Sequence, residues 1–489
     1  MKFGVLRVSF NFSQALKWST LNNVIKFTYS LVVPILLARI LGPEPFGILA
    51  MAFVVVGLSQ IFIEFGIGDA VVRSSKINEE FLSSLFWFNF LIGSCIYVLI
   101  LIFTPIVSDY FQKDVLNQVI PILSTVILFQ LISIITSALM RRRGDFLSIA
   151  KASFISKLIS SIGAIYLALY GYGLVSLIFL SLSQAIIYSI ILILKERWIP
   201  KLIFSLGVIK SVFKFTISIF YIRLLNHFER ESDRIFIGPA FGEAILGIYT
   251  RSTAIRRSLE RFISGSLGPV LFSATVKDKD FFVINNRILD SYVGLLLIFF
   301  PLFCFFYFLS KPITLFLFGD EWKLMIELLK PISFLFLLRP FYKVNQEIIK
   351  AHLDMNFLNI IWSFNLICLI LLFIFFAPNF GIKGYIYAII ITNLLLFIPS
   401  TIYLFVALRI KLHFFVELIK DTFLRNLFIL IFSLFYRDIL NIAGLENFYL
   451  LEILIFPFII ILILYICQKV QPIDMHQEIE RFMLDFIKK

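Results

Sequence analysis

Residues 41–48 read LGPEPFGI, and residues 237–242 read IGPAFG before the chain reaches Gly247-Ile248-Tyr249. Each stretch is a turn marked by glycine and proline between two long apolar windows. Each turn also separates the first window from the second in a run of six, so the sequence contains an internal repeat. If the windows cross a membrane, two halves with the same even number of spans share one orientation. We therefore expect two similar lobes around a central cavity.

The composition is that of a membrane protein. Of the 489 residues, 60% are hydrophobic and 59 are phenylalanine. Only 15% are charged, whereas soluble proteins carry about 25%. The mean hydropathy is +0.96. An all-α, polytopic membrane protein is predicted, with little chain left over for a soluble domain.

The apolar windows predict about fourteen spans, if each span takes about 20 residues. Two groups of six windows flank the basic stretch 195–201, and two further windows follow. The windows lie near 18–38, 47–66, 84–105, 117–139, 152–170, 174–194, 213–238, 245–272, 290–310, 324–347, 357–377, 384–407, 423–440 and 449–467. They predict an N-terminal six-helix lobe (1–200), a C-terminal six-helix lobe (201–412), two additional helices (413–468) and a tail (469–489).

The distribution of lysine and arginine predicts the orientation. The net charge is +13, and cytoplasmic loops accumulate basic residues, so no nucleic-acid partner is needed to explain it. We expect the chain to lie in the inner membrane of a bacterial cell. If Arg141, Arg142 and Arg143 are on the cytoplasmic side of this membrane, both termini are also in the cytoplasm. Residues 469–489 have helical amphipathic spacing, which indicates a helix on the inner surface; a frayed, solubilising tail is the alternative.

Known catalytic and metal-binding patterns are absent from the sequence. There is no Walker A motif and no GxSxG elbow. The cysteines and histidines are too scattered for a zinc site or a disulfide framework. We expect no catalytic residue, no metal and no cofactor. These scattered residues are Cys95, Cys304, Cys368, Cys467, His227, His352, His413 and His476.

Charged residues inside apolar helices carry the functional information, because a charge at the bilayer centre costs at least about 2.5–3.5 kcal/mol. In the seventh window, cationic residues recur every three or four positions and so lie on one helix face. Asn226, Glu229 and Asp233 border that face. The stripe predicts a hydrated cavity with a positive lining, suited to a multiply anionic group such as a diphosphate. Its members are Arg223, His227, Arg230 and Arg234.

Other windows add polar and charged residues to the predicted cavity. Lys26 and Asn22 lie in the first window, and the basic residues Arg251, Arg257, Arg339 and Lys343 lie in the eighth and tenth. Four acidic residues are candidates for ion coupling, namely Glu64, Asp69, Glu229 and Asp233. His227 fits either a proton site or a hydrogen-bonding lining residue. As an alternative, all these charges pair internally and only hold the lobes together.

A family resemblance rests on residues 37–47 and 64–72, which read LARILGPEPFG and EFGIGDAVV, and on 233–238, 246–249 and 269–273 in the second half. The chain resembles the O-antigen and polysaccharide-unit flippases (Wzx-like) of the multidrug/oligosaccharidyl-lipid/polysaccharide exporter superfamily. It departs from the family pattern at Ser273-Ala274, where a proline is usual after Phe272.

The resemblance implies a MATE/MOP-like fold, with two six-helix bundles that alternate between inward-open and outward-open states and two appended helices. It implies transport of undecaprenyl-diphosphate-linked oligosaccharides to the outer leaflet, for O-antigen, capsule or exopolysaccharide. The implied partners are this lipid-linked substrate, membrane lipids, a polysaccharide polymerase and a chain-length regulator.

Three other functions are considered. A multidrug-type exporter of the same superfamily needs acids that attract cations, whereas arginine prevails here. A membrane glycan polymerase or ligase usually presents a sizeable outer loop, and none is visible. A structural scaffold would tolerate neutralisation of the intramembrane charges.

Overall fold

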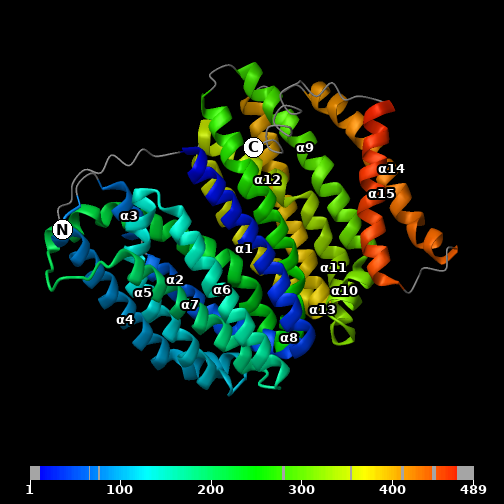
Figure 1. Cartoon of the computed structure of the whole chain (residues 1–489). Helices are drawn as coiled ribbons and strands as arrows, with labels where there is room; N and C mark the ends of the chain where they lie inside the picture. Colours follow the sequence, from blue (N-terminus) through cyan, green and yellow to red (C-terminus); the bar gives the residue numbers. More distant parts are fainter. Residues whose placement is uncertain are drawn as a thin grey trace. The chain divides into compact units, whose positions relative to one another are not determined.

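The computed structural model describes residues 12–64, 67–74, 77–277, 281–352, 355–408, 412–442 and 448–470, and every regular element in these ranges is a helix (Figure 1). The helices are α1 (Phe12–Leu41), α2 (Glu44–Glu64), α3 (Ile67–Arg73), α4 (Glu79–Phe111), α5 (Leu116–Arg143), α6 (Phe146–Leu169), α7 (Leu174–Glu196), α8 (Leu206–Lys277), α9 (Phe281–Phe308), α10 (Ser310–Leu317), α11 (Leu324–Ser333), α12 (Arg339–His352), α13 (Met355–Ala407), α14 (Leu412–Ile442) and α15 (Tyr449–Val470), with 3-10 turns η1 (Asp320–Trp322) and η2 (Phe334–Leu337).

The chain divides into two compact units, which are residues 1–251 and 252–489. The division falls inside α8, whereas the sequence pattern placed a lobe boundary after residue 200, in the segment between α7 and α8. Within the described residues, six helices are long and apolar enough to cross a membrane by length and composition. One of them, residues 356–407, has 52 residues, which is enough for two crossings at about 20 residues each.

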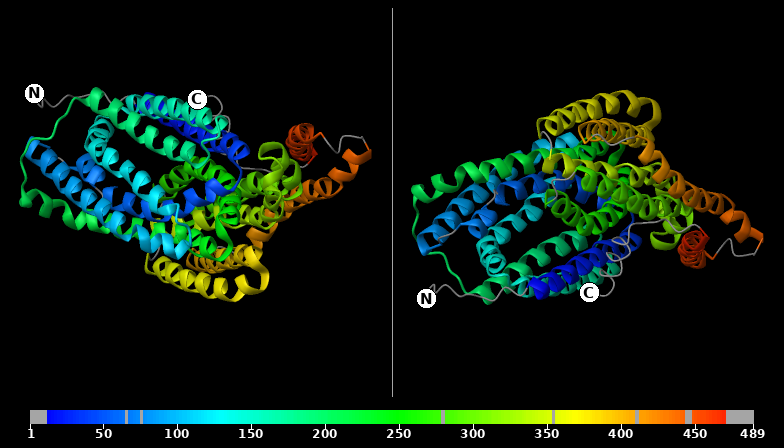
Figure 2. Two further views of the ribbon diagram at one scale, coloured as in Figure 1. Left: turned by 90° about the horizontal axis from the view of Figure 1, so that it is seen from below. Right: turned by 90° about the horizontal axis from the view of Figure 1, so that it is seen from above.

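In the first unit, α4, α5, α6 and α7 pack against one another in sequence, and α1 lies on α6. The blue, cyan and green ribbons of these helices run side by side in Figure 1 and in both views of Figure 2. Helix α6 turns a stripe of small residues inward, including Ser156, Ser160 and Ala164. Small side chains let apolar helices approach closely without relying on a hydrophobic driving force.

In the second unit, α9 packs against α11 and α14, and α12 packs against α13. The predicted tenth span, 324–347, is not one helix: α11 ends at Ser333, η2 follows, and α12 begins at Arg339. Pro340 explains the break, because proline lacks the backbone N–H that a continuous helix needs, whereas Pro331 lies within α11. Pro340 is tolerated in the first turn of α12, where that N–H has no helical partner.

The repeated turns share a backbone feature. Gly42 ends α1 with φ of 71°, and Gly242 interrupts α8 with φ of 82°, both in the left-handed region that favours glycine. The sequence comparison instead set Gly42-Pro43 beside Gly238-Pro239, which lies within the helical part of α8. When the two turns are aligned by backbone conformation instead of by sequence, Gly42 corresponds to Gly242 and Gly47 corresponds to Gly247.

These two turns touch backbone to backbone within the first unit. A Cβ atom on Gly47 would lie 1.8 Å from the carbonyl oxygen of Glu243. A Cβ atom on Gly247 would lie 2.0 Å from the carbonyl oxygen of Pro43. Both neighbours are main-chain atoms, which cannot rotate away as a side chain can. The starts of α2 and of the second segment of α8 are thus held together at two glycines.

We predict that Gly47→Ala and Gly247→Ala each lower the thermal unfolding midpoint of the detergent-purified protein. The added methyl group forces a backbone shift, and overpacking of this kind costs about 1–3 kcal/mol. Gly294→Ala is the control, because a Cβ there meets nothing within 4 Å. An unchanged midpoint in both test variants would show that the contact does not constrain the fold.

Candidate functional site

A cluster of charged side chains lies inside the second unit, on α8 and α12. Arg256 and Glu260 are four residues apart on α8, and Arg339 and Lys343 are four apart on α12. Residues at this spacing share one face of a helix. Each helix therefore contributes two charged side chains from a single face. We call these four residues the α8–α12 charge cluster.

Arg256 and Glu260 form a buried ion pair. Arg256 Nη1 lies 2.5 Å from Glu260 Oε1, and each side chain is only 4% exposed. Arg256 Nε is also buried and has no hydrogen-bond partner among the residues that the structure describes. A buried charge without a counter-ion is costly, so the Glu260 carboxylate is what permits the Arg256 guanidinium in this position.

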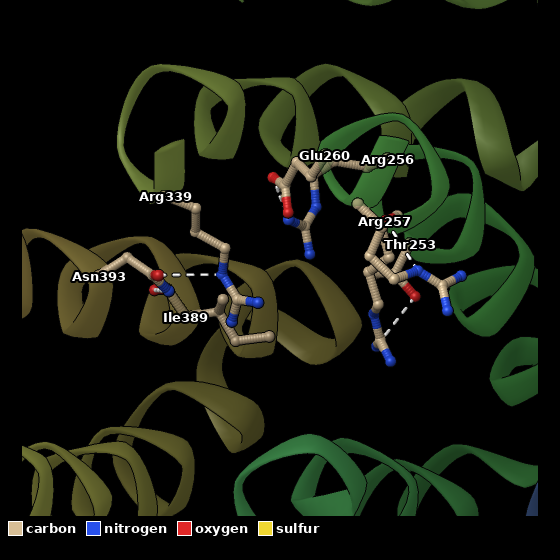
Figure 3. Close-up of polar contacts among 8 residues, drawn as sticks. Thr253, Arg256, Arg257, Glu260, Arg339, Ile389 and Asn393 are labelled. Atoms are coloured by element: carbon tan, nitrogen blue, oxygen red, sulfur yellow. Dashed lines mark hydrogen bonds and ion pairs between the residues drawn. The ribbon is translucent and has the colours of Figure 1, made fainter. Parts of the chain in front are cut away.

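Arg339 is oriented from α13. Its Nε donates a hydrogen bond to Asn393 Oδ1 at 3.0 Å. The Asn393 amide is itself fixed, because its Nδ2 donates to the Ile389 carbonyl oxygen at 2.7 Å. In Figure 3, Arg256 reaches from α8 and Arg339 from α12 toward the same space, with Glu260 beside Arg256. The Asn393 contact uses only the Nε of Arg339 and leaves its terminal nitrogens for another acceptor.

The charge cluster carries an excess of positive charge. The Lys343 ammonium is half-buried and close enough to Glu260, Arg339 and Arg256 to interact with them electrostatically. Three cations, Arg256, Arg339 and Lys343, face one anion, Glu260, so the net charge of the cluster is +2. Arginine and lysine side chains carry donors and no acceptor. The cluster is therefore suited to an anion with several oxygen atoms.

A polar network fixes α12 between α9 and α13. The Tyr292 hydroxyl donates to Asn345 Oδ1. Asn345 Nδ2 in turn donates to Ser400 Oγ at 3.0 Å and to Thr401 Oγ1 at 2.9 Å. Buried polar groups must be hydrogen-bonded, so this network specifies one register of α12. It lies within two turns of Arg339 and Lys343 and so sets where their side chains begin.

Two further arginines extend the α8 side of the cluster. Arg257 Nη2 donates to Thr253 Oγ1 at 3.2 Å (Figure 3). Arg261 Nε donates to the Arg257 carbonyl oxygen at 3.2 Å, and its Nη2 donates to Ser258 Oγ at 3.3 Å. These hydrogen bonds to neutral groups orient the two guanidinium groups on α8.

Some predicted site residues of the seventh and eighth windows lie in the first unit, and they contact residues outside the α8–α12 charge cluster. Arg234 pairs with Glu231 at 2.5 Å, and the Tyr249 hydroxyl donates to Asp233 Oδ2 at 2.6 Å. Arg251 lies over the Phe46 ring, with 4.9 Å from its Cζ to the ring centroid. His227 is buried, and a Cβ on Gly57 of α2 would lie 3.0 Å from its Cε1.

Asp69, a predicted coupling residue, lies 3.7 Å from Arg141 and keeps 37% of its side chain exposed. Several predicted residues cannot be placed, because their side chains lie outside the described part of the chain; these are Asn22, Lys26, Glu64, Arg223, Glu229 and Arg230. Most of the predicted tail helix 469–489, namely residues 471–489, lies outside it as well. The cavity lining by all these residues stays a prediction.

The sequence places Arg256 and Glu260 among the charges of the eighth window but does not select them as site residues, and it does not single out Asn393. The charges of the eighth window wrap around the helix, so no single face stood out. The available signal was the spacing of four between Arg256 and Glu260, which marks an ion pair on one helix. Asn393 gave no signal, since its role depends on how α13 packs against α12.

Comparison with known proteins identifies the family. Residues 36–327 match the family described as polysaccharide biosynthesis protein. The chain belongs to this family. It is 25% identical over 343 residues to the teichuronic acid biosynthesis protein TuaB of Bacillus subtilis, covering 68% of this chain and 70% of that protein. It is also 25% identical over 308 residues to the succinoglycan biosynthesis transport protein ExoT of Rhizobium meliloti, covering 62% of each.

Solved structures show the same fold. The lipid II flippase MurJ in an inward closed conformation superposes with a TM-score of 0.73 at 17% identity, covering 94% of this chain and 99% of that one. An inward-facing MATE multidrug transporter superposes with a TM-score of 0.62 at 16% identity, covering 81% and 96%. The prediction of an all-helical, multi-pass membrane protein with a MATE-like fold is confirmed, as is membership of the polysaccharide transporter family.

We predict that Asn393→Ala lowers the unfolding midpoint of the purified protein, because it leaves the Arg339 Nε without its acceptor. Loss of one partner of such a hydrogen bond costs about 1–3 kcal/mol. Asn379→Ala is the matched control: Asn379 is exposed on the same helix and donates only to the Phe375 carbonyl oxygen. Equal midpoints for the two variants would contradict the assigned role of Asn393.

Proposed function

We propose that this protein moves undecaprenyl-diphosphate-linked oligosaccharide units from the cytoplasmic to the outer leaflet by alternating access. The cargo would serve O-antigen, capsule or exopolysaccharide synthesis, alongside a polymerase and a chain-length regulator. Support comes from the family and from relatives whose names refer to teichuronic acid, succinoglycan transport and lipopolysaccharide. The fold shared with a lipid II flippase also supports it. In this proposal the protein makes and breaks no covalent bond.

The observation that carries the proposal is the net charge of +2 in the α8–α12 charge cluster. A diphosphate offers several oxygen acceptors, and guanidinium groups bind phosphate oxygens with two parallel, charge-assisted hydrogen bonds. A drug exporter that attracts cations would need the opposite charge balance. The polyprenyl tail remains in lipid while the headgroup crosses.

The proposed membrane arrangement follows the sequence pattern. It has about fourteen spans, as two lobes of six, 1–200 and 201–412, with two further helices in 413–468. Both termini lie in the cytoplasm of a bacterial cell whose inner membrane holds the protein.

The basic residues of the predicted cavity, and one asparagine, are proposed to face this headgroup. They are Asn22, Lys26, Arg223, His227, Arg230, Arg234, Arg251, Arg257, Arg339 and Lys343. Four acidic residues are proposed to couple transport to an ion, namely Glu64, Asp69, Glu229 and Asp233.

The test is reconstitution of the purified protein into liposomes with a fluorescent lipid-diphosphate oligosaccharide. We expect protein-dependent movement of the fluorophore to the opposite leaflet. Arg339→Gln and Lys343→Gln should each slow it about tenfold or more, because a hydrogen bond to a charged group is worth about 1.5–3 kcal/mol.

Lys323→Gln is the control, since it also removes one positive charge but from an exposed pair with Asp320. Formation of new glycosidic bonds would instead indicate a polymerase or ligase. Unchanged transport in Arg339→Gln and Lys343→Gln would remove the charge cluster from the substrate path.

A further inference from the structure

Glu260 is the acid that stands out when the ion pairs of the second unit are compared. The Lys383–Glu327 pair exposes 44% and 56% of its side chains, and the Lys350–Glu347 pair exposes 31% and 38%. The Arg256–Glu260 pair exposes 4% of each. Surface pairs contribute little, whereas a buried acid that faces a cationic cluster strongly affects the charges around it.

We infer that Glu260 is an internal stand-in for the substrate, a carboxylate that occupies the anion site of the empty transporter and is displaced from Arg256 by the arriving diphosphate. The inference rests on the proposed function and assigns Glu260 a positioning role that controls binding and release of the headgroup.

The geometry allows the exchange. The two side chains are one helical turn apart on α8, and Glu260 accepts from Arg256 Nη1. A rotation of the Glu260 side chain therefore breaks the pair without moving the helix. Among the described side chains, Arg256 is the one ion-pair partner of the Glu260 carboxylate, so an anion with more oxygen atoms can replace it.

The charge cluster has more hydrogen-bond donors than the Glu260 carboxylate can accept. Within the described part of the chain, the buried Arg256 Nε has no hydrogen-bond partner, and Asn393 Oδ1 accepts a hydrogen bond from the Nε of Arg339 but not from its terminal nitrogens. The Lys343 ammonium lies near the same carboxylate. A carboxylate has two oxygens and one charge, whereas a diphosphate brings more of both. The diphosphate is therefore the better acceptor set for these donors.

The exchange between Glu260 and the substrate also explains how the diphosphate is released from the charge cluster. Three cations left without any anion in a buried site would hold a diphosphate very tightly, because removing it would expose uncompensated charge. When Glu260 pairs again with Arg256, it compensates part of that charge as the substrate leaves. Glu260 thus weakens binding and speeds turnover.

The first measurement is the thermal midpoint of Glu260→Gln with and without inorganic pyrophosphate. We expect a lowered midpoint that pyrophosphate restores, with a larger shift than in the parent protein, since a ligand stabilises the state that binds it. Glu327→Gln, an exposed paired acid in the same unit, should show the parent's response. A lowered midpoint that pyrophosphate does not restore would show a purely structural ion pair and overturn the inference.

The second measurement uses the liposome assay and direct binding of pyrophosphate to the full-length protein. Glu260→Gln should bind about tenfold more tightly and flip the lipid-diphosphate about tenfold more slowly, because its release is not assisted. If the parent protein flips substrate and Glu260→Gln binds and flips as the parent does, the inference alone is wrong. If the parent flips nothing, the proposed function is wrong.

Discussion

A charge inside an apolar helix bundle has to be compensated, and the pairing of Arg256 with Glu260 is where this constraint is most severe. Both side chains are almost fully buried, so each depends on the other for its ionised state. One acid cannot compensate three cations, and the remaining positive charge makes the site receptive to an anion. A related constraint, that buried polar groups must be hydrogen-bonded, explains why Asn393 holds Arg339 and why Tyr292 and Asn345 fix α12.

The glycine contact serves a different purpose in the first unit. Gly47 and Gly247 occupy matching places after the left-handed residues Gly42 and Gly242, and their backbones meet with no room for a side chain. Around them, Lys113 pairs with Glu243 at 2.5 Å, and a Cβ on Gly238 would meet the Phe111 ring. The repeated turn is therefore both a sign of the internal repeat and a packing element.

The sequence predicted the features that depend on local pattern. Hydropathy identified the helical membrane class, and the two glycine-marked stretches 41–48 and 237–242 contain the positive-φ residues Gly42 and Gly242. It did not separate α11 from α12, because an apolar window cannot show that a helix ends at Ser333 and a new one begins at Arg339. It also did not select Glu260 or Asn393 as site residues, because their roles depend on contacts between side chains, and periodicity does not encode the geometry of those contacts. The cations can be identified from the sequence, but the acid that compensates them is identified only from the side-chain contacts in the folded structure.

The central claim is that guanidinium groups of the second unit bind the diphosphate of a lipid-linked glycan. An experimental structure of the full-length protein with a lipid-diphosphate oligosaccharide bound tests it most directly. The account predicts phosphate oxygens within about 4 Å of the Arg256 and Arg339 guanidinium nitrogens, with the Glu260 carboxylate turned away. A diphosphate bound elsewhere, with Arg256 still paired to Glu260, would contradict it.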